Sequence, residues 1–234
     1  GVDFDAEIWR WKYIEGDGKC VVARPTRDGA IVAHYGGAPR HICYFGTAAL
    51  AIQVCDVMVL PEIRGQYGKN SLFFKVAATF LEREIGNTVR HLLGFGFPNQ
   101  KAMTIAIRLG LYEKTDDFVE VLYPRSDEPM KNSAYTVTTL DLADEKQRLQ
   151  LDSLWRAMRA DFEDNIIGVR NCDYIRYRYF EHPFARRKQY RCVLIRDSIS
   201  HQPLAIAILK NKDSYTLIMD LICPLDSVSP AICT

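Results

Sequence analysis

The chain has 234 residues, 48% of them hydrophobic, so it is long enough to bury one large core or two smaller ones. Its 30 Lys and Arg residues balance 29 Asp and Glu residues, and a net charge of +1 gives no general electrostatic reason for nucleic acid or an anionic membrane as the main partner. The apolar runs are broken well before the roughly 20 residues of a membrane-spanning helix, and the first residues lack the pattern of an export signal. We therefore expect a cytoplasmic protein without a membrane span.

The cysteines and histidines predict no metal site. Seven cysteines are scattered without a close pair, and five histidines form no ligand pattern. Zinc sites and disulfide frameworks both depend on regular, closely spaced ligands or pairs. We therefore expect no metal ion, and cysteines that stay reduced.

The first third of the chain predicts a helix followed by a sheet. Phe4, Ile8 and Trp11 recur at spacings of four and three, which indicates a short amphipathic helix at residues 5–13. Strand-like runs follow, separated by turn-forming residues at 26–29 and 36–39. Their short connections predict an antiparallel meander with strands at residues 20–23, 30–35, 42–45 and 50–59.

The pattern changes after Pro61. A helix-period segment begins near Leu72 and ends near Gly86, where a C-terminal cap belongs. A strand at 89–95, a loop at 96–99, a helix at 100–109 and a final strand at 118–122 complete a predicted mixed α/β domain of residues 1–124. The polar segment after it, which contains Pro129, is interpreted as a linker covering residues 125–140.

The second domain, residues 141–234, is predicted to begin with a long helix, because Leu151, Leu154 and Trp155 share one apolar face. It also repeats features of the first domain. Arg-Trp-Lys-Tyr at 10–13 aligns with Arg-Tyr-Arg-Tyr at 176–179, and Asp56 with Pro61 corresponds to Asp220 with Pro224. No glycine-rich turn or later helices follow before the end, so we expect the opening half of a degenerate second copy, in a chain that stops in mid-domain or lacks residues.

The segment that carries chemistry is the strand, Arg-Gly turn and helix around residues 57–71. Backbone N–H groups at a helix N-terminus form an anion cradle, Gly65 and Gly68 let the backbone approach phosphate, and Arg64 adds a fixed cation. The sequence Val-Met-Val-Leu-Pro-Glu-Ile-Arg-Gly at 57–65 resembles the acyl-CoA pyrophosphate motif of the GNAT superfamily of N-acetyltransferases. The loop Gly-Phe-Pro-Asn at 96–99, the helix after it and Leu-Gly-Leu at 109–111 resemble the segment that flanks the CoA arm in that superfamily.

The resemblance covers roughly residues 8–115 and, more faintly, 174–224, and it implies an α/β fold of the α+β type. A mixed, mostly antiparallel sheet flanked by helices would be followed by a partial second GNAT-like unit. The aromatic and cationic run at 9–13 looks like the two-domain branch of the superfamily. The resemblance also implies that the two strands at 50–59 and 89–95 run parallel and splay apart to admit the thioester arm.

For the site, the resemblance implies an acyl-CoA donor that binds without a metal, and acetyl-CoA is the donor we expect first. The residues implied in donor binding are Met58, Val59, Arg64, Gly65, Gln66, Tyr67, Gly68, Lys69 and Asn99. Glu62 is the candidate base that removes the amine proton, with Asp56 and His34 as alternatives, and Tyr112 is the candidate acid. Each has a structural alternative: Glu62 as a solvated turn residue, Asp56 as a partner of the N-terminal helix, His34 as a strand residue, and Tyr112 as a packing residue.

Two departures from the family pattern keep other functions open. Tyr67 and Lys69 occupy positions where the family usually has small residues. Ala106 occupies the position where the family often has its general-acid tyrosine. The predicted function is an N-acyltransferase acting on a small-molecule or peptide amine, either as a monomer or as a homodimer. One alternative is a non-catalytic acyl-CoA-binding or scaffold module. Another is a transferase with an aminoacyl-tRNA or acyl-carrier-protein donor, which would use the basic stretch at 170–196 and would be the one case involving nucleic acid.

Overall fold

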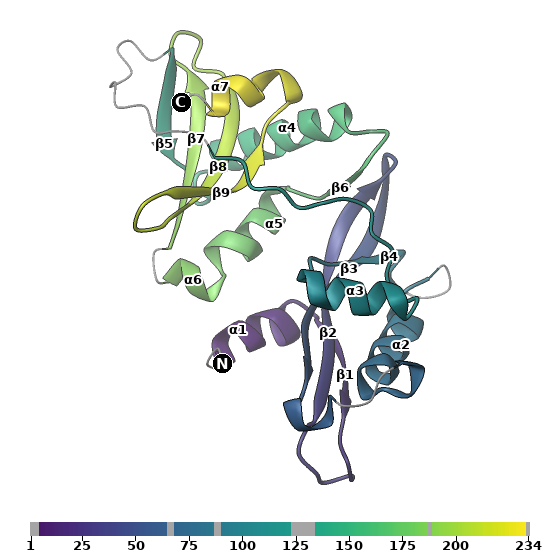
Figure 1. The fold of residues 1–234 in the computed structure, drawn as a ribbon. Helices are drawn as coiled ribbons and strands as arrows, with labels where there is room; N and C mark the ends of the chain where they lie inside the picture. The colour runs from purple at the N-terminus through teal and green to yellow at the C-terminus, as the bar shows by residue number, and fades with distance from the viewer. Residues whose placement is uncertain (1–4, 65–67, 87–89, 123–133, 187–188, 233–234) are drawn as a thin grey trace. The chain divides into compact units, whose positions relative to one another are not determined.

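The structure is a computed structural model that describes residues 5–64, 68–86, 90–122, 134–186 and 189–232. It divides into two compact units, the first made of residues 1–41 and 49–123 and the second of residues 42–48 and 124–234. Figure 1 shows the elements in chain order. The boundary differs from a simple division near residue 124, because the tip of one hairpin, residues 42–48, belongs to the second unit.

The first unit is built on a mixed sheet with the order β1-β2-β3-β4. Its strands are β1 (Lys19–Ala23), β2 (Ala33–Tyr44), β3 (Thr47–Val59) and β4 (Leu93–Phe95). β1 and β2 are antiparallel, whereas β3 and β4 are parallel, as the sequence predicts. The parallel pairing requires the long crossover that α2 (Leu72–Glu84) supplies.

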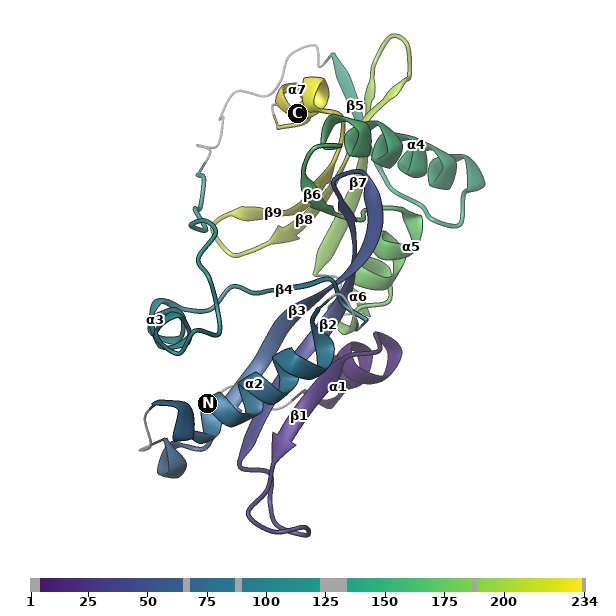
Figure 2. The same cartoon turned by 90° about the vertical axis from the view of Figure 1, so that its right-hand side faces the viewer.

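Helices cover both faces of this sheet, as Figure 2 shows for α1 and α2. On one face, α1 (Ala6–Arg10) continues into a π-helix, η1 (Trp11–Glu15). Neighbouring glycines of β2 show why both helices approach so closely: a Cβ at Gly36 would clash with the Tyr13 hydroxyl, and one at Gly37 would lie 2.7 Å from Ile52 and 2.8 Å from Phe80. The two glycines therefore admit packing from opposite sides of one strand.

The turn predicted at residues 36–39 is wrong, because these residues lie inside the twelve-residue strand β2. Their Gly and Pro residues have other reasons to be there. Gly36 and Gly37 make room for Tyr13 and Phe80. On the edge of β2 that faces β1 and β6, Pro39 lies between the residues that pair with β1, which end at Gly37, and those that pair with β6, which begin at Ile42. On that edge its missing N–H removes no bond from the ladder.

The final strand predicted at residues 118–122 is also wrong. Residues 113–122 have no regular structure, and the side chains of Phe118, Val119 and Leu122 are 86%, 71% and 79% exposed. Alternation of apolar residues favours a strand only where a neighbouring strand pairs with it, and no described strand does so here. The helix before it is correct: α3 (Gln100–Arg108) is followed by Gly110 with a positive φ of 71°.

The second unit has a four-stranded antiparallel sheet with the order β5-β7-β8-β9. Its strands are β5 (Tyr135–Thr139), β7 (Tyr190–Asp197), β8 (Pro203–Asn211) and β9 (Thr216–Ile222). β5 lies within the segment interpreted as a linker, residues 125–140, of which residues 125–133 lie outside the described part of the chain. A short strand, β6 (Ile166–Gly168), pairs with the tip of β2.

Side chains alternate across the second sheet, and each face buries its own core. Leu194 and Ile206 pack with the long helix α4 (Glu145–Asp161) and with α5 (Cys172–Ile175), whereas Val193 and Ala205 pack toward α7 (Val228–Ile232). The unit also contains α6 (Pro183–Arg186). No described helix has both the length and the apolar character of a membrane span.

The internal repeat is visible in the geometry of the two units. A second π-helix, η4 (Arg176–Phe180), holds Tyr179 as η1 holds Tyr13. Tyr13 donates a 2.7 Å hydrogen bond to Asp56, and Tyr179 donates a 3.1 Å hydrogen bond to Asp220. After each aspartate comes a proline and a short 3-10 helix, η2 (Pro61–Ile63) or η5 (Leu225–Ser227). The paired segments of the sequence therefore fold into paired structures.

Candidate functional site

A groove opens in the first unit at the point where β3 and β4 stop pairing. Their parallel ladder joins three residue pairs and ends at Gln53 and Phe95. The next residues of the two strands, Val54 and Gly96, both line the groove, which has a volume of about 1000 Å³. The groove therefore lies beyond the end of β4, beside the part of β3 that β4 does not pair with. Because β4 itself ends at Phe95, the expected splaying of two strands stays a prediction.

The walls of the groove come from α2, β4, α3 and the segment after α3. Apolar side chains, including Leu81, Ile85, Met103 and Ile107, make up about half of the lining. The polar side chains are as many and include Asn99, Thr104 and Tyr112, together with the carboxylates of Glu82, Glu113, Asp116 and Asp117. A groove lined by both kinds of side chain suits a ligand that carries both apolar and polar groups.

Tyr112 lines this groove and is partly buried. Its hydroxyl forms a hydrogen bond with that of Tyr35, a fully buried residue of β2. Burial raises the pKa of Tyr112 above its ordinary value, although the hydrogen bond with Tyr35 acts in the opposite direction. Tyr112 therefore stays protonated at neutral pH and presents a hydrogen-bond donor.

Asn99 and Ala106 lie on α3 with different roles. Asn99 lines the groove and caps the helix, because its Oδ1 accepts a 3.0 Å hydrogen bond from the amide of Ala102. Ala106, where the family often has its acid, is fully buried and faces away from the groove lining. Of these positions, Tyr112 is therefore the one with a hydroxyl at the groove.

The predicted phosphate cradle lies between the end of β3 and α2, and residues 65–67, which include Gly65, Gln66 and Tyr67, are outside the described part of the chain. Arg64 is exposed, and its Nε donates a 2.9 Å hydrogen bond to the carbonyl of Val59. Gly68 has a positive φ of 75°, and a Cβ there would meet nothing within 4 Å. Lys69 is exposed in η3 (Gly68–Asn70), and Ser71 caps α2.

None of these cradle residues lines the groove as described, and neither do Met58 and Val59, of which Met58 is exposed and Val59 buried. The Val59 carbonyl is already an acceptor for Arg64. The open space beside Gly68 is where an anion could approach the backbone, because a glycine with positive φ leaves its amide uncovered.

The three candidate bases differ in their surroundings. Glu62 is exposed in the first turn of η2. Asp56 accepts hydrogen bonds of 2.7 Å from both Lys12 and Tyr13. Burial raises the Asp56 pKa, but these two hydrogen bonds outweigh burial, so the pKa lies below its ordinary value. His34 directs Nδ1 to the Asp56 carbonyl at 2.7 Å, which makes Nδ1 the donor and leaves Nε2 as an acceptor. Asp56 is thus a partner of the N-terminal helix, whereas Glu62 and His34 remain available to accept a proton.

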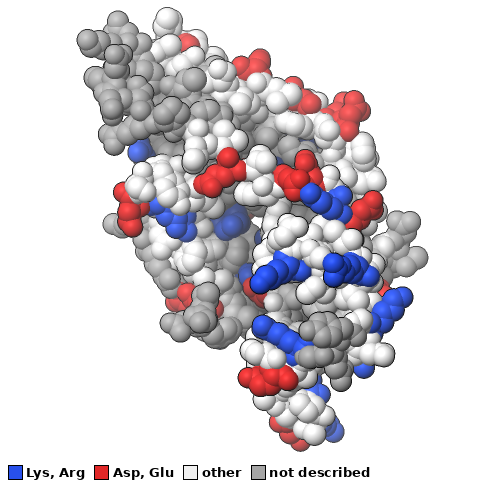
Figure 3. Space-filling model, in the orientation of Figure 1, with Lys and Arg blue, Asp and Glu red and all other residues white. Residues whose placement is uncertain are grey.

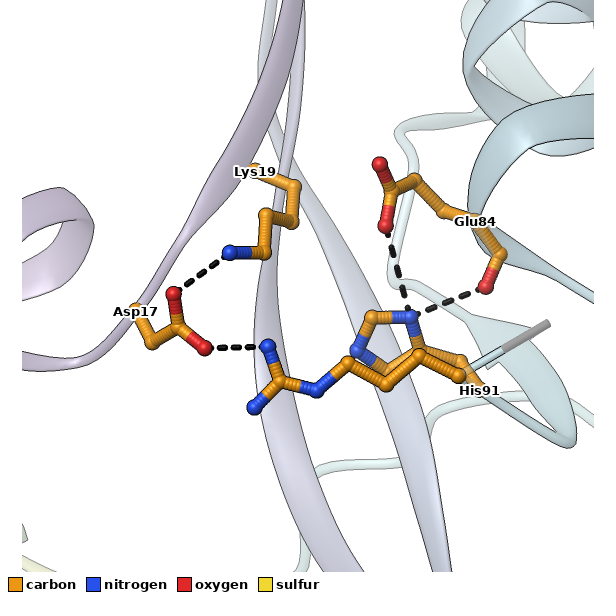
Figure 4. Close-up of polar contacts among 5 residues, drawn as sticks. Asp17, Lys19, Glu84 and His91 are labelled. Atoms are coloured by element: carbon orange, nitrogen blue, oxygen red, sulfur yellow. Dashed lines mark hydrogen bonds and ion pairs between the residues drawn. The ribbon is translucent and has the colours of Figure 1, made fainter.

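Contacts at the other end of β4, drawn in Figure 4, hold the start of that strand. His91 is fully buried, and its Nδ1 lies 2.9 Å from the carbonyl of Glu84 and 3.6 Å from the carboxylate of the same residue. Asp17 pairs with Lys19 and Arg90. These contacts tie the entry to β4 against the end of α2 and against β1, so the separation of β3 from β4 begins only beyond Phe95.

Charged groups lie on both units. In Figure 3, Lys and Arg side chains gather over α3, which carries Lys101 and Arg108 and forms one wall of the groove. In the basic stretch at 170–196 several cations are already engaged: Arg170 with Asp220, Arg176 with Asp173, and Arg196 with Thr138 and Gln150. No group of three or more His, Cys, Asp or Glu side chains among the described residues could hold a metal ion.

The comparison with solved structures shows which fold the chain has. A conserved protein of unknown function from Enterococcus faecalis V583, described as a probable N-acyltransferase, matches with a TM-score of 0.54 and 15% identity, over 88% of this chain and 48% of its own length. The chain has a GNAT-type fold. Saccharomyces cerevisiae N-myristoyltransferase with bound myristoyl-CoA matches with a TM-score of 0.49 and 10% identity, over 94% of this chain and 54% of that one.

The chain therefore spans about half the length of these solved structures. A scan against protein-family models finds no match, and a search of the curated proteins finds none either. The predicted fold class is confirmed: a GNAT-like mixed sheet flanked by helices.

Sequence reasoning missed one residue beside the groove, Tyr35. The alternation of β2 placed it toward the core, but nothing in the sequence paired it with Tyr112, which is 77 positions away. The available signal was chemical: a tyrosine on the buried face of a strand needs a partner for its hydroxyl.

Proposed function

We propose that the first unit is an N-acyltransferase that takes an acyl group from acyl-CoA, with acetyl-CoA as the first donor to test, and transfers it to an amine of a small molecule or peptide. The observation that carries this proposal is the groove that opens beyond the end of β4, with Tyr112 among the residues that line it. The GNAT-type fold supports the same function, and the probable N-acyltransferase of similar fold is consistent with it.

The groove fits the chemistry of such a donor. The pantetheine arm of CoA is a flexible chain of methylene and amide groups, and a groove lined by both apolar and polar side chains suits it. The phosphates would lie nearer the N-terminus of α2, where Gly68 leaves open space and Arg64 and Lys69 are exposed. Asn99 and Tyr112 remain as polar groups along the arm.

The residues of the chain would divide the work of direct acyl transfer. Glu62 would accept the proton of the attacking amine, either directly or through water, while backbone groups at the end of β3 near Met58 and Val59 would orient the thioester carbonyl. Tyr112 would donate a hydrogen bond to the sulfur as the thiolate leaves. A thiolate is a better leaving group than an amine, so departure of the thiolate needs less help from an acid than deprotonation of the attacking amine needs from a base.

Filling the groove should block donor binding. Thr104 of α3 lines the groove and is partly buried, and its hydroxyl donates a 2.9 Å hydrogen bond to the carbonyl of Gln100 in the same helix. We expect Thr104→Trp to weaken acetyl-CoA binding at least tenfold in calorimetry, because the indole would occupy space needed by the arm. Thr104→Val, which removes the hydroxyl and keeps the size, should bind normally. Equal affinities in the two variants would mean that the arm lies elsewhere.

Removing the Arg64 cation should weaken CoA binding about tenfold or more, since a charge-assisted phosphate contact contributes on the order of 1.5–3 kcal/mol. Arg64→Ala also deletes the hydrogen bond to Val59, so the melting temperature must be measured beside the calorimetric affinity. Arg83→Ala, at an exposed arginine near the other end of α2, is the matched control. Unchanged CoA affinity in Arg64→Ala would mean that Arg64 serves only to hold the end of β3 and does not contact the phosphates.

The deciding experiment is thiol release from acyl-CoA across a panel of amines, amino acids and amino sugars. We expect release with acetyl-CoA and an acylated amine as the second product. If CoA binds by calorimetry but no donor gives thiol or acylated product, the non-catalytic binding module replaces the enzyme. If aminoacyl-tRNA or an acyl carrier protein donates where acyl-CoA does not, the donor class is wrong and the transferase remains.

A further inference from the structure

Tyr35 places a hydroxyl group in an otherwise apolar core. Its side chain has no exposed surface and packs among Ile52, Phe73 and Phe80. Among the described residues, the hydroxyl of Tyr112 is its hydrogen-bond partner. Tyr112 differs because it lines the groove and is only partly buried.

This difference decides which hydroxyl donates. If Tyr112 donated to Tyr35, the Tyr35 hydrogen would be buried without an acceptor, and such an unsatisfied group is costly. If Tyr35 donates to Tyr112, both hydrogens are satisfied, because the Tyr112 hydrogen then turns toward the groove. The packed ring of Tyr35 thus fixes the direction of the Tyr112 O–H bond.

Burial raises the pKa of both tyrosines, so at neutral pH each hydroxyl keeps its hydrogen and the pair has two hydrogens to place. A hydroxyl that accepts one hydrogen bond becomes a stronger donor in the next.

We propose that Tyr35 is a positioning residue that holds the Tyr112 hydroxyl with its hydrogen directed into the groove, toward the sulfur of the bound donor. The proposal rests on the proposed acyl transfer. In that reaction the amine nitrogen forms a bond to the thioester carbon, the carbon–sulfur bond breaks, and the sulfur keeps the electron pair. Glu62 or solvent takes the amine proton, the Tyr112 O–H bond remains intact while it donates to the thiolate, and solvent then protonates the sulfur.

Binding of CoA and desulfo-CoA tests the proposal without any turnover. At about pH 9.5 the CoA thiol is mostly ionised, since a free thiol has a pKa near 8.5, and Tyr112 is still protonated. By calorimetry, the parent protein should prefer CoA over desulfo-CoA, and Tyr35→Phe should reduce that preference about fivefold. An identical preference in parent and variant would overturn the proposal.

Stability measurements test the hydrogen bond itself. Tyr112→Phe leaves the Tyr35 hydroxyl buried without a partner, so the double variant Tyr35→Phe/Tyr112→Phe should unfold at a higher urea concentration than Tyr112→Phe alone. The proposal fails if the double variant is no more stable than that single variant.

Turnover separates this proposal from the proposed function. If the parent releases thiol, Tyr35→Phe should lower kcat about fivefold without changing KM for acyl-CoA, and the Tyr112→Phe background should abolish that effect. Tyr179→Phe is the matched control, since its equally buried hydroxyl bonds to Asp220 in the second unit. An active parent with unchanged kcat in Tyr35→Phe overturns the positioning role. An inactive parent overturns the acyltransferase, and the CoA preference then decides the role of Tyr35.

Discussion

Replacing Glu62 with glutamine is expected to lower kcat by about 10²-fold or more, which is the range for removing one general base. Glutamine keeps the size of the side chain but cannot accept the amine proton. Glu62 is exposed in η2, so the change should leave the stability within about 0.5 kcal/mol of the parent. Thiol release at saturating donor and acceptor measures the effect.

Two further variants interpret that result. Tyr112→Phe should cost less than about tenfold in kcat, because the thiolate leaves with little assistance. His34→Gln tests the competing base, whose Nε2 is an acceptor because Nδ1 donates to the Asp56 carbonyl. Full activity of Glu62→Gln together with a large loss in His34→Gln would move the base from Glu62 to His34 and leave the reaction class unchanged.

Replacing Asp220 with asparagine should destabilise the second unit by about 3 kcal/mol, because it leaves a charged partner uncompensated in a mostly buried place. Arg170 Nε lies 2.7 Å from Asp220, and the Asp220 side chain is only 6% exposed. Asparagine keeps the shape and can still accept from Tyr179, so the effect isolates the charge of Asp220. Hydrogen exchange resolved by peptide should show faster exchange in β7, β8 and β9.

The matched variant in the first unit is Asp56→Asn, which should cost less than about 1 kcal/mol. The Asp56 carboxylate is 43% exposed, and its ion pair with Lys12 is correspondingly screened by water. The pKa of Asp56 is lower in the folded state than in the unfolded state. Asp56 therefore stabilises the fold fully above its unfolded-state pKa of about 4, and this stabilisation is lost as the pH falls through its folded-state pKa. Equal destabilisation by the two substitutions would contradict the difference in burial on which both expectations rest.

The fold could be predicted where local pattern and tertiary structure agree. The helices α2 and α3 and the correspondence of Tyr13 with Tyr179 follow from residue order, whereas the parallel pairing of β3 with β4 was implied by the family resemblance. The prediction failed where a residue serves a distant neighbour. Gly36 and Gly37 look like turn formers, yet they are small because Tyr13 and Phe80 pack against them from opposite faces.

The site could be predicted only as far as its motifs reach. Asn99 and Tyr112 were singled out, and both line the groove. The hydrogen bond between Tyr35 and Tyr112 could not be predicted, because one strand and one loop residue far apart in the chain meet only after the sheet has packed. For the strand expected at 118–122, alternation was present but no described partner pairs with it, and a strand is stable only with a partner.

The two π-helical turns have a consequence for insertions and deletions. Each holds one residue more than an α-helical turn would, and that extra residue sets the rotational phase at which Tyr13 and Tyr179 leave their helices. Deleting one residue ahead of Tyr13 within η1 would rotate the tyrosine by ~100° about the helix axis and carry its hydroxyl away from Asp56. A gap of one residue should therefore be tolerated less at these two places than a change of any exposed side chain beside them.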